Sequence, residues 1–482
     1  MYPPRLRSFV SVSIALAKSD GIKDVLSHDL GHVFGTLFNM IRWTSRYFSI
    51  WLRASLLGIL IIFGYLCFYP PNDHGRLLTF KPANSTSGKD YSPGANIVVS
   101  VKTGASEAAG RIPIQMRTSL RDVQNVVFFS DLEQDLGEHH LYDALDTIVP
   151  SIMENNPDFD FYRNQLKLWN SSHDISSLKN ERHPTSGELA AWILDKYKNV
   201  HILEKTWALM PDYDWYIFID ADTYLLWDNI VTWLSILDPK KKSYFGSEVN
   251  TAGVKFAHGG TGIIISKATM YKFAVTDAGM AANYDPIVPN KCCGDLVLGM
   301  ALRESGTLLQ DAWPAMSGEA PWTLPFGPGT PEYWCRPALT LHHLSPEGMA
   351  EFTKFEDQRT NKSTPLTHEE IFNTFILESL VSERENWDNL ASERGEFGKT
   401  GGVTSETLTF EECAQVCEAD EKCFQYSHHD NTCNIGMSVR LGYKKEADGE
   451  GVWRSGWNKT RLDEWAAKQP RCGPVTFPKQ DK

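Results

Sequence analysis

The sequence lacks the excess of basic residues that non-specific binding to nucleic acid requires. Its 60 acidic residues outnumber its 47 lysines and arginines, which leaves a formal net charge of -13. Because phosphate backbones attract basic surfaces, this balance argues against a nucleic-acid partner. The chain also lacks an internal repeat. Its 482 residues exceed the usual size of one domain, so we expect two folded units with extensions.

Charged residues are missing from 54–72, and the stretch LLGILIIFGYLCFY within it is nearly all apolar. Such a run predicts a short transmembrane helix. A buried core helix and a signal peptide are the alternatives, but about fifty residues precede the run and no small-residue cleavage pattern follows it. Arginines gather on its N-terminal side, so we expect a type II signal-anchor with a cytosolic tail, 1–53, and a lumenal remainder.

No Asn-X-Ser/Thr sequon precedes that run. Four follow it, at Asn84, Asn170, Asn361 and Asn458. Eight of the nine cysteines also follow it, and in an oxidising lumen they could form four disulfides. The cysteines between Cys413 and Cys433 lack the close CxxC pairs of structural zinc sites, which favours disulfides over metal there.

The composition then changes along the chain. Residues 73–112 are rich in Pro, Gly, Ser and Asn with little periodicity, which predicts a stem. Beyond them, strand-like runs alternate with helical patterns, which predicts an α/β domain over 113–380. We expect strands at 125–131, 215–220, 243–247, 262–266 and 338–343, and helices at 187–209, 227–237 and 295–304. A charged, glycine-containing stretch, 381–402, predicts a linker to a small disulfide-rich unit, 403–482.

Two carboxylates, Asp220 and Asp222, end the apolar strand WYIFID. Charge at the end of a buried strand is costly to desolvate, which indicates a partner of opposite charge. Alternate residues of an extended chain share a face, so both side chains could hold one hard cation such as Mn²⁺ or Mg²⁺, which can also hold a diphosphate. A solvated turn is the alternative, and the apolar strand before the pair argues against it.

Two more segments could complete such a site. His342 and His343 end the expected strand ALTLHH, and ligands of open α/β sheets bind outside the carboxyl ends of strands, so we expect one of the two imidazoles to coordinate. Asp295 opens a predicted helix whose N-terminus favours the ionised carboxylate that a general base needs, although capping that helix is the alternative role. Cys292 and Cys293, if oxidised, would fix this loop.

The run HGGTGIIIS, at 258–266, places three glycines before a predicted strand. Glycine lets the backbone approach a substrate closely, although a plain turn is the alternative. The spacing fits neither the dinucleotide-binding nor the P-loop pattern.

Taken in order, FFSD, IDADTY, YFGS, HGGTGIIIS, CCGDLVLG and LTLHH resemble the Fringe and core-1 β1,3-galactosyltransferase family, glycosyltransferase family 31, over about residues 113–355. The resemblance implies a GT-A fold, a Rossmann-like nucleotide-sugar transferase. It also implies a lumenal Golgi location and manganese-dependent transfer from a UDP-sugar, with inversion at the anomeric carbon.

By position, Asp220 and Asp222 match the family's metal-binding acidic motif, which reads DDD in many relatives and DAD here. His342 matches the downstream metal-ligand histidine, and Asp295 matches the acid of the segment that supplies the catalytic base. Asp131, which ends the first expected strand, is our prediction for a nucleotide contact.

The C-terminal cysteine cluster is similar to the PAN or apple fold. This similarity implies nested disulfides, Cys413 with Cys433 and Cys417 with Cys423, and a protein or carbohydrate ligand. A transferase followed by such a module resembles fungal membrane glycosyltransferases.

The expected function is transfer of a sugar, with galactose favoured, from a UDP-sugar to a glycan such as O-linked GalNAc on a glycoprotein, in a β1,3 linkage. A catalytically inactive carbohydrate-binding or adaptor protein is the alternative, and a glycosidase, which also uses paired carboxylates, is a third. The presence of Asp220, Asp222, Asp295 and His342 together argues against an inactive protein. The histidine and the two-residue spacing suit a cation better than hydrolysis.

Overall fold

The computed structural model describes residues 94–481, apart from gaps at 183–187, 331, 393–400 and 407. The predicted cytosolic tail, the apolar run at 54–72 and most of the predicted stem lie outside the described residues. All described residues belong to the unit Lys89–Lys482. Within this part of the chain, no helix is long and apolar enough to span a bilayer.

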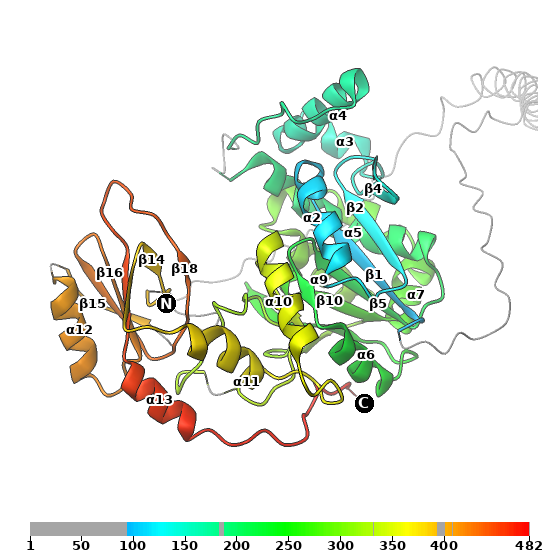
Figure 1. Cartoon of the computed structure of the whole chain (residues 1–482). Coiled ribbons are helices and arrows are strands. Elements are labelled where there is room, and N and C mark those ends of the chain that lie inside the picture. Colours follow the sequence, from blue (N-terminus) through cyan, green and yellow to red (C-terminus); the bar gives the residue numbers. More distant parts are fainter. Residues whose placement is uncertain (1–93, 183–187, 331, 393–400, 407, 482) are drawn as a thin grey trace, which may run out of the picture. The chain divides into compact units, whose positions relative to one another are not determined.

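An eight-stranded mixed sheet runs through the larger part of this unit, with the order β11-β7-β10-β5-β1-β2-β4-β3 (Figure 1). Its strands are β1 (Ile97–Lys102), β2 (Val126–Ser130), β3 (Gln134–Leu136), β4 (His139–Asp143), β5 (Trp215–Asp220), β7 (Tyr244–Gly246), β10 (Ile263–Ser266) and β11 (Leu309–Asp311). Strands β4, β2, β1 and β5 are parallel, whereas β10 is antiparallel to both of its neighbours. In the register of β1 and β5, Lys102 lies opposite Asp220, so two charged residues meet at the carboxyl ends of the central strands.

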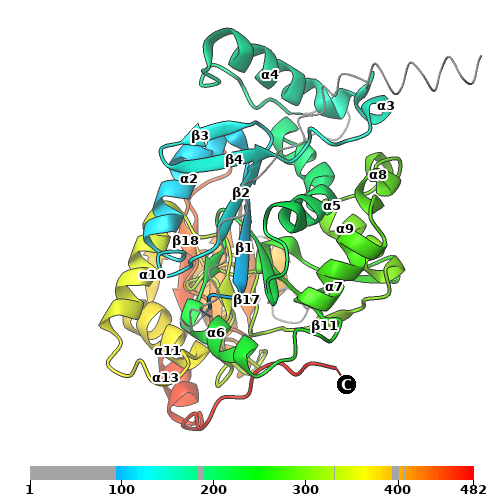
Figure 2. The ribbon, with the colours of Figure 1, turned by 90° about the vertical axis from the view of Figure 1, so that its right-hand side faces the viewer.

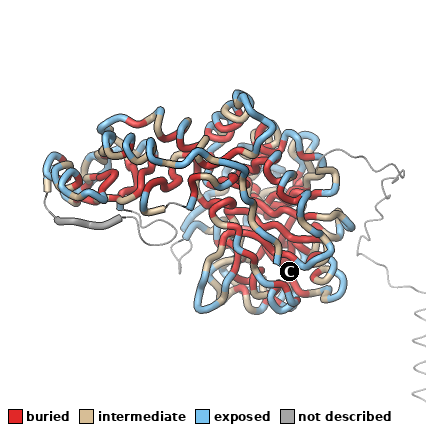
Figure 3. The backbone as a smooth tube through the Cα atoms, turned by 90° about the horizontal axis from the view of Figure 1, so that it is seen from below, coloured by how far each residue is buried: buried red, intermediate tan, exposed pale blue. Residues whose placement is uncertain are grey.

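Helices cover both faces of the sheet, which is why β1 and β5 are almost continuously apolar. One face packs against α5 (Ala190–Leu209), α7 (Lys267–Tyr271), α8 (Met280–Tyr284) and α9 (Gly294–Glu304). The other packs against α2 (Ala105–Arg117) and α6 (Trp227–Ser235), and α10 (Pro346–Gln358) lies against α2. Figure 2 shows these two groups of helices on opposite sides of β1. In Figure 3 the buried backbone lies mostly in the interior of the folded part, and exposed segments lie along its edges.

Residues 97–112 correct the stem prediction, because they form the central strand β1 and most of α2. Val98, Val99 and Val101 in β1 are fully buried. The run IVVSV is apolar and largely β-branched, a composition that favours strands. The neighbouring Pro-, Gly- and Ser-rich residues concealed this signal.

The other predicted elements of this part occur close to their expected bounds. Strands β2, β5, β7 and β10 and helices α5, α6 and α9 lie within or near the predicted ranges. Trp227 and Trp233 of α6 are core residues. The strand expected at 338–343 is shorter: β12 (Thr340–Leu341) pairs with β6 (Tyr224–Leu225). Further elements are α3 (Pro150–Met153), α4 (Asp160–Ser172), β8 (Glu248–Thr251), β9 (Val254–Ala257) and α11 (His368–Ile371).

The C-terminal module has a five-stranded sheet of order β13-β19-β16-β17-β15. Its elements are β13 (Glu383–Glu385), β14 (Trp387–Asp388), β15 (Gly401–Glu406), α12 (Phe410–Ala419), β16 (Gln425–His429), β17 (Thr432–Gly436), β18 (Tyr443–Lys444), β19 (Arg454–Trp457) and α13 (Lys459–Ala467). We predicted a linker over 381–402, but β13 pairs with β19 and β14 with β18. Backbone pairing needs no apolar pattern, so composition did not reveal these strands.

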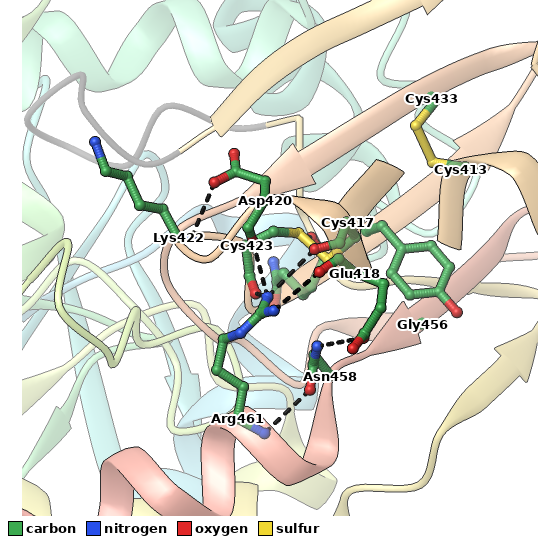
Figure 4. Close-up of a disulfide and its surroundings, with 12 residues drawn as sticks. Cys413, Cys417, Glu418, Asp420, Lys422, Cys423, Cys433, Gly456, Asn458 and Arg461 are labelled. Atoms are coloured by element: carbon green, nitrogen blue, oxygen red, sulfur yellow. Dashed lines mark hydrogen bonds between the residues drawn. A yellow bond between two sulfur atoms is a disulfide. The ribbon is translucent and has the colours of Figure 1, made fainter. Parts of the chain in front are cut away.

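Disulfides join Cys413 to Cys433 and Cys417 to Cys423, the pairs that the apple-like resemblance implied (Figure 4). The Arg461 guanidinium on α13 donates hydrogen bonds to the carbonyls of Cys417, Glu418 and Cys423, at and just beyond the end of α12. A cation suits this position, because the carbonyls at a helix C-terminus have no partner within the helix. Membership of the module in the apple family stays a prediction.

A third disulfide, Cys335–Cys472, joins residues 137 positions apart. It lies beside a hydrophobic cluster that includes Tyr224 and Phe326 together with Trp457 of the module. After Cys472 the chain returns to the larger sheet, where the Trp233 indole donates to the Pro478 carbonyl at 2.9 Å. The C-terminal residues therefore do not all belong to the module to which we assigned 403–482.

Candidate active site

Charged side chains converge at the carboxyl ends of β1 and β5. The Lys102 ammonium lies 3.2 Å from an Asp220 carboxylate oxygen and 3.7 Å from one of Asp195 on α5. Burial opposes the charged form of Lys102, but Asp195 and Asp220 outweigh it and raise the pKa of Lys102. Burial raises the pKa of Asp220, with Lys102 acting against it. Asp220 is thus neutralised by a lysine that lay in the predicted stem.

The pairing of β6 with β12 brings a distant histidine to the second aspartate. Leu341 lies opposite Tyr224, so His342 follows directly beside Asp222. His342 Nε2 is 3.1 Å from Asp222 Oδ1. Burial opposes the charged forms of both side chains, but the contact between them outweighs burial. It raises the pKa of His342 and lowers the pKa of Asp222 to about 2.

His343 also turns toward Asp222, contrary to the alternation of side chains that we expected. Its Nδ1 lies 3.9 Å from Asp222 Oδ2, although its side chain is 67% exposed. Strand β12 ends at Leu341, and His343 has a positive φ of 59°. This left-handed conformation places the two imidazole rings 3.8 Å apart, on the same side of the chain.

Gly259 and Gly260 approach the site too closely for any larger residue. A Cβ at Gly260 would lie 2.1 Å from His342 Cε1, and one at Gly259 would lie 2.6 Å from Asp295 Oδ1. The Gly259 N–H also donates to Asp295 Oδ2 at 2.7 Å. The glycine run is therefore required for close packing, which a plain turn would not need.

Asp295 lies in the first turn of α9, and its carboxylate faces the site. Its Oδ1 accepts a 2.6 Å hydrogen bond from the Asn199 amide on α5, and its Oδ2 accepts the bond from Gly259. The cap position of α9 belongs to Cys293, which makes no side-chain cap bond. Both oxygens of the Asp295 carboxylate therefore accept hydrogen bonds, so the structure presents an oriented acceptor there.

Asp131 does not contact the site, which corrects our prediction of a nucleotide contact. It is 1% exposed, and its carboxylate accepts hydrogen bonds from the Ala105 N–H at 2.7 Å and the Lys198 ammonium at 3.3 Å. Lys198 also pairs with Asp195 at 2.7 Å. Asp131 therefore positions α2 and, through Lys198, the Asp195 side chain.

Two adjoining cavities open over these residues. One is lined by Asp220, Asp222 and both histidines, and the other by Asp295, His258 and the two cysteines before α9. Both share Lys102, Trp192, Asp195, Asp220, His342 and His343. Trp192 on α5 is 54% exposed and offers an aromatic face to both cavities.

Sequence reasoning missed several of these contributors, including Lys102, Trp192, Asp195 and Asn199. Asp195 and Asn199 stand four residues apart within the predicted helix 187–209, so the sequence alone placed them on one face. Nothing in the sequence showed that this face meets the strand ends.

The residues fit a divalent cation. One donor atom from each of Asp222, His342 and His343 lies within 4.8 Å of the others. The Nδ1 of His342 is buried and has no hydrogen-bond partner among the described residues. Carboxylate and imidazole donors suit Mn²⁺ and related ions. Asp220 stands beside this group and faces Lys102, so it would have to leave that pair, or share it, to join Asp222 as predicted.

Comparison with known proteins finds a matching family model and several similar solved structures. A family model described as Fringe-like matches residues 93–307. Similar solved structures include the glycosyltransferase GlyE of Streptococcus pneumoniae TIGR4, at 11% identity, covering 47% of this chain and 47% of that chain with a TM-score of 0.25. A second is a glycosyltransferase involved in glycosylation of the major capsid of PBCV-1, at 12% identity, covering 53% of this chain and 98% of that chain with a TM-score of 0.26. A third is the galactosyltransferase LgtC in complex with donor and acceptor sugar analogues, at 13% identity, covering 55% of this chain and 96% of that chain with a TM-score of 0.27.

TM-scores this low support no detailed comparison of the structures, and this chain spans about half the length of GlyE. No curated protein matches the chain. Residues 93–307 are Fringe-like, which confirms the resemblance drawn from the sequence motifs. The matched range ends before His342, so the family model does not reach that histidine, which the structure places beside Asp222.

Proposed function

We propose that this protein is an inverting, metal-dependent glycosyltransferase. It would move a sugar, for which galactose is our choice, from a UDP-sugar to a hydroxyl of a glycan such as O-linked GalNAc on a glycoprotein, forming a β1,3 linkage. The Fringe-like match over 93–307 supports this class of reaction. The choice of sugar, linkage and acceptor follows from the family resemblance.

One observation carries the proposal: Gly259 and Gly260 hold the proposed base and the proposed metal ligand side by side. Gly259 donates to Asp295, and Gly260 abuts His342. Asp222 completes the ligand group through His342. Residues from four distant segments thus meet at one place. A structural role for any single one of these residues would not require the other three to be there.

The chain's own residues supply the remaining chemistry. Asp295 would accept a proton from the acceptor hydroxyl, which then attacks the anomeric carbon from the face opposite the departing diphosphate. Asn199 and Gly259 fix the orientation of the Asp295 carboxylate. Lys102 adds positive charge beside Asp220, and Trp192 offers an aromatic face on which a ring could stack. A bound Mn²⁺ would stabilise the charge that builds on the diphosphate.

We also propose that the protein is a single-pass type II membrane protein of the Golgi with its catalytic part in the lumen. The apolar run 54–72, the basic residues before it and the sequons after it support this location. The three disulfides agree with an oxidising compartment. For the apple-like module we propose a protein or carbohydrate ligand.

Asp295→Asn tests the proposed base. Because general-base catalysis contributes about 10²- to 10⁴-fold, we expect turnover of the UDP-sugar onto an acceptor to fall at least about 100-fold. Affinity for UDP with Mn²⁺, measured by calorimetry, should stay unchanged, whereas a merely structural role would lower both quantities. Asp122→Asn is the matched control, because Asp122 is exposed and its ion pair is with neighbouring Arg121.

Undiminished turnover of Asp295→Asn would show that the base is wrong. A panel of UDP-sugars with and without Mn²⁺ tests the class itself. If the protein bound neither UDP nor Mn²⁺, we would abandon the transferase. Wild-type protein that binds them but turns over no donor would favour the inactive adaptor.

A further inference from the structure

Two adjacent cysteines in the wall of the Asp295 cavity have no role in the mechanism above. Cys292 is exposed and Cys293 half-buried, and neither is disulfide-bonded in the structure. Their sulfur atoms nevertheless lie 2.7 Å apart, well inside the contact distance of two unbonded sulfurs. Both line the cavity that Asp295, His258 and His342 also line.

The surroundings of the pair favour oxidation. All six other cysteines of the described residues form disulfides. A compartment that oxidises those pairs would also act on an exposed thiol next to a second one. The pair is absent from the groups of described residues that could hold a metal ion.

We propose that Cys292 and Cys293 form a disulfide in the mature protein, which closes a small ring at the start of α9. The bond requires an external disulfide, such as glutathione disulfide, as oxidant. The Cys292 sulfur attacks it, and one thiol leaves. Cys293 then attacks the mixed disulfide and releases the second thiol, so the pair loses two protons and two electrons and the oxidant gains them.

The bond would stiffen the segment that carries Asp295. Cys293 directly precedes α9, and a Cβ at the next residue, Gly294, would lie 2.9 Å from the Asn199 amide. The start of α9 is therefore pressed against the residue that orients the Asp295 carboxylate. A closed ring removes backbone freedom two residues before that carboxylate. It also gives the cavity a rigid sulfur face where the acceptor would bind.

Mass spectrometry of the full-length protein tests the bond without reference to activity. Free thiols are labelled with N-ethylmaleimide in denaturant without reductant, and the protein is digested with trypsin. The peptide 292–303, CCGDLVLGMALR, contains both cysteines and no other. We expect it unlabelled and two hydrogens lighter than the dithiol form, and doubly labelled after prior reduction with dithiothreitol.

Two labels without reduction would overturn the proposal, and so would linkage of this peptide to another cysteine-containing peptide. Cys292→Ser is the control variant, because it leaves one thiol in the peptide and should take up one label. Adjacent Cα atoms are about 3.8 Å apart, closer than the roughly 4.4–6.8 Å of ordinary disulfides, so this ring should open at a lower dithiothreitol concentration than the other three bonds.

The effect on catalysis rests on the proposed function. When labelling shows that this bond alone is open, we expect kcat to fall about tenfold while UDP affinity stays the same, because small misplacement of a catalytic group is costly. An unchanged kcat would overturn the positioning effect. Oxidised protein that turns over no donor would count against the transferase and leave the disulfide result standing.

Discussion

Replacing Glu356 by glutamine should change how stability depends on pH. Glu356 on α10 accepts a hydrogen bond from Tyr224, which follows the acidic site by two residues. Burial raises the pKa of Glu356 from 4.5 to about 7, although the Tyr224 hydrogen bond and Arg121 oppose the rise. Between these two values the folded state holds a proton that the unfolded state has lost. Wild-type stability therefore falls as the pH rises through this window.

The magnitude follows from the two pKa values. At about 1.4 kcal/mol per pKa unit, a rise from 4.5 to about 7 corresponds to at most about 3 to 4 kcal/mol of unfolding free energy. Glutamine cannot titrate, so the stability of Glu356→Gln relative to wild type should increase by up to this amount between pH 4.5 and 7. Above and below the window the difference should be constant, whatever offset the substitution itself introduces.

Urea unfolding of the two proteins at a series of pH values measures this difference. Asp357→Asn is the matched control, because Asp357 is exposed and its hydrogen bond with Arg121 lowers the pKa of Asp357. Its variant should not gain stability over the same window. A flat or falling difference between Glu356→Gln and wild type from pH 4.5 to 7 would refute the reasoning.

The site and the surface give two further predictions. Gly260→Ala should weaken Mn²⁺ binding, measured by calorimetry, at least about tenfold, because the new Cβ would displace the His342 ring. The control Gly110→Ala, on an exposed part of α2, should leave Mn²⁺ affinity unchanged, and equal affinities of the two variants would contradict this account. Peptide mass spectrometry of secretory material should find N-glycans at Asn170 and Asn361, which are exposed, but not at Asn458, whose side chain caps α13 and donates to Glu418. Higher occupancy at Asn458 than at the other two would count against it.

The sequence predicted the acidic strand end, because its signal is local. WYIFID combines a buried apolar run with two carboxylates, and the structure has this strand at the expected residues. The proximity of His342 to Asp222 was also expected, although the β6–β12 pairing that produces it spans more than a hundred residues. The rule that ligands bind at the carboxyl ends of strands suggested this link, and the resemblance to a family then singled out His342.

The errors came from properties that local composition does not encode. Lys102 was missed because its strand follows a Pro- and Ser-rich stretch and was assigned to the stem. Asp131 also follows a strand, but the Ala105 N–H and Lys198 hold it inside the protein. The side on which His343 lies depends on its positive φ, which its residue type did not predict.

The Cys335–Cys472 bond has a practical consequence for anyone who handles this protein. A single proteolytic cut anywhere between these two residues leaves both fragments joined through sulfur. Nicked molecules would therefore migrate as intact protein on a gel until reductant is added. Removing the last dozen residues, in contrast, would delete Cys472 and with it this disulfide. It would also expose the Trp233 indole, which donates to the Pro478 carbonyl.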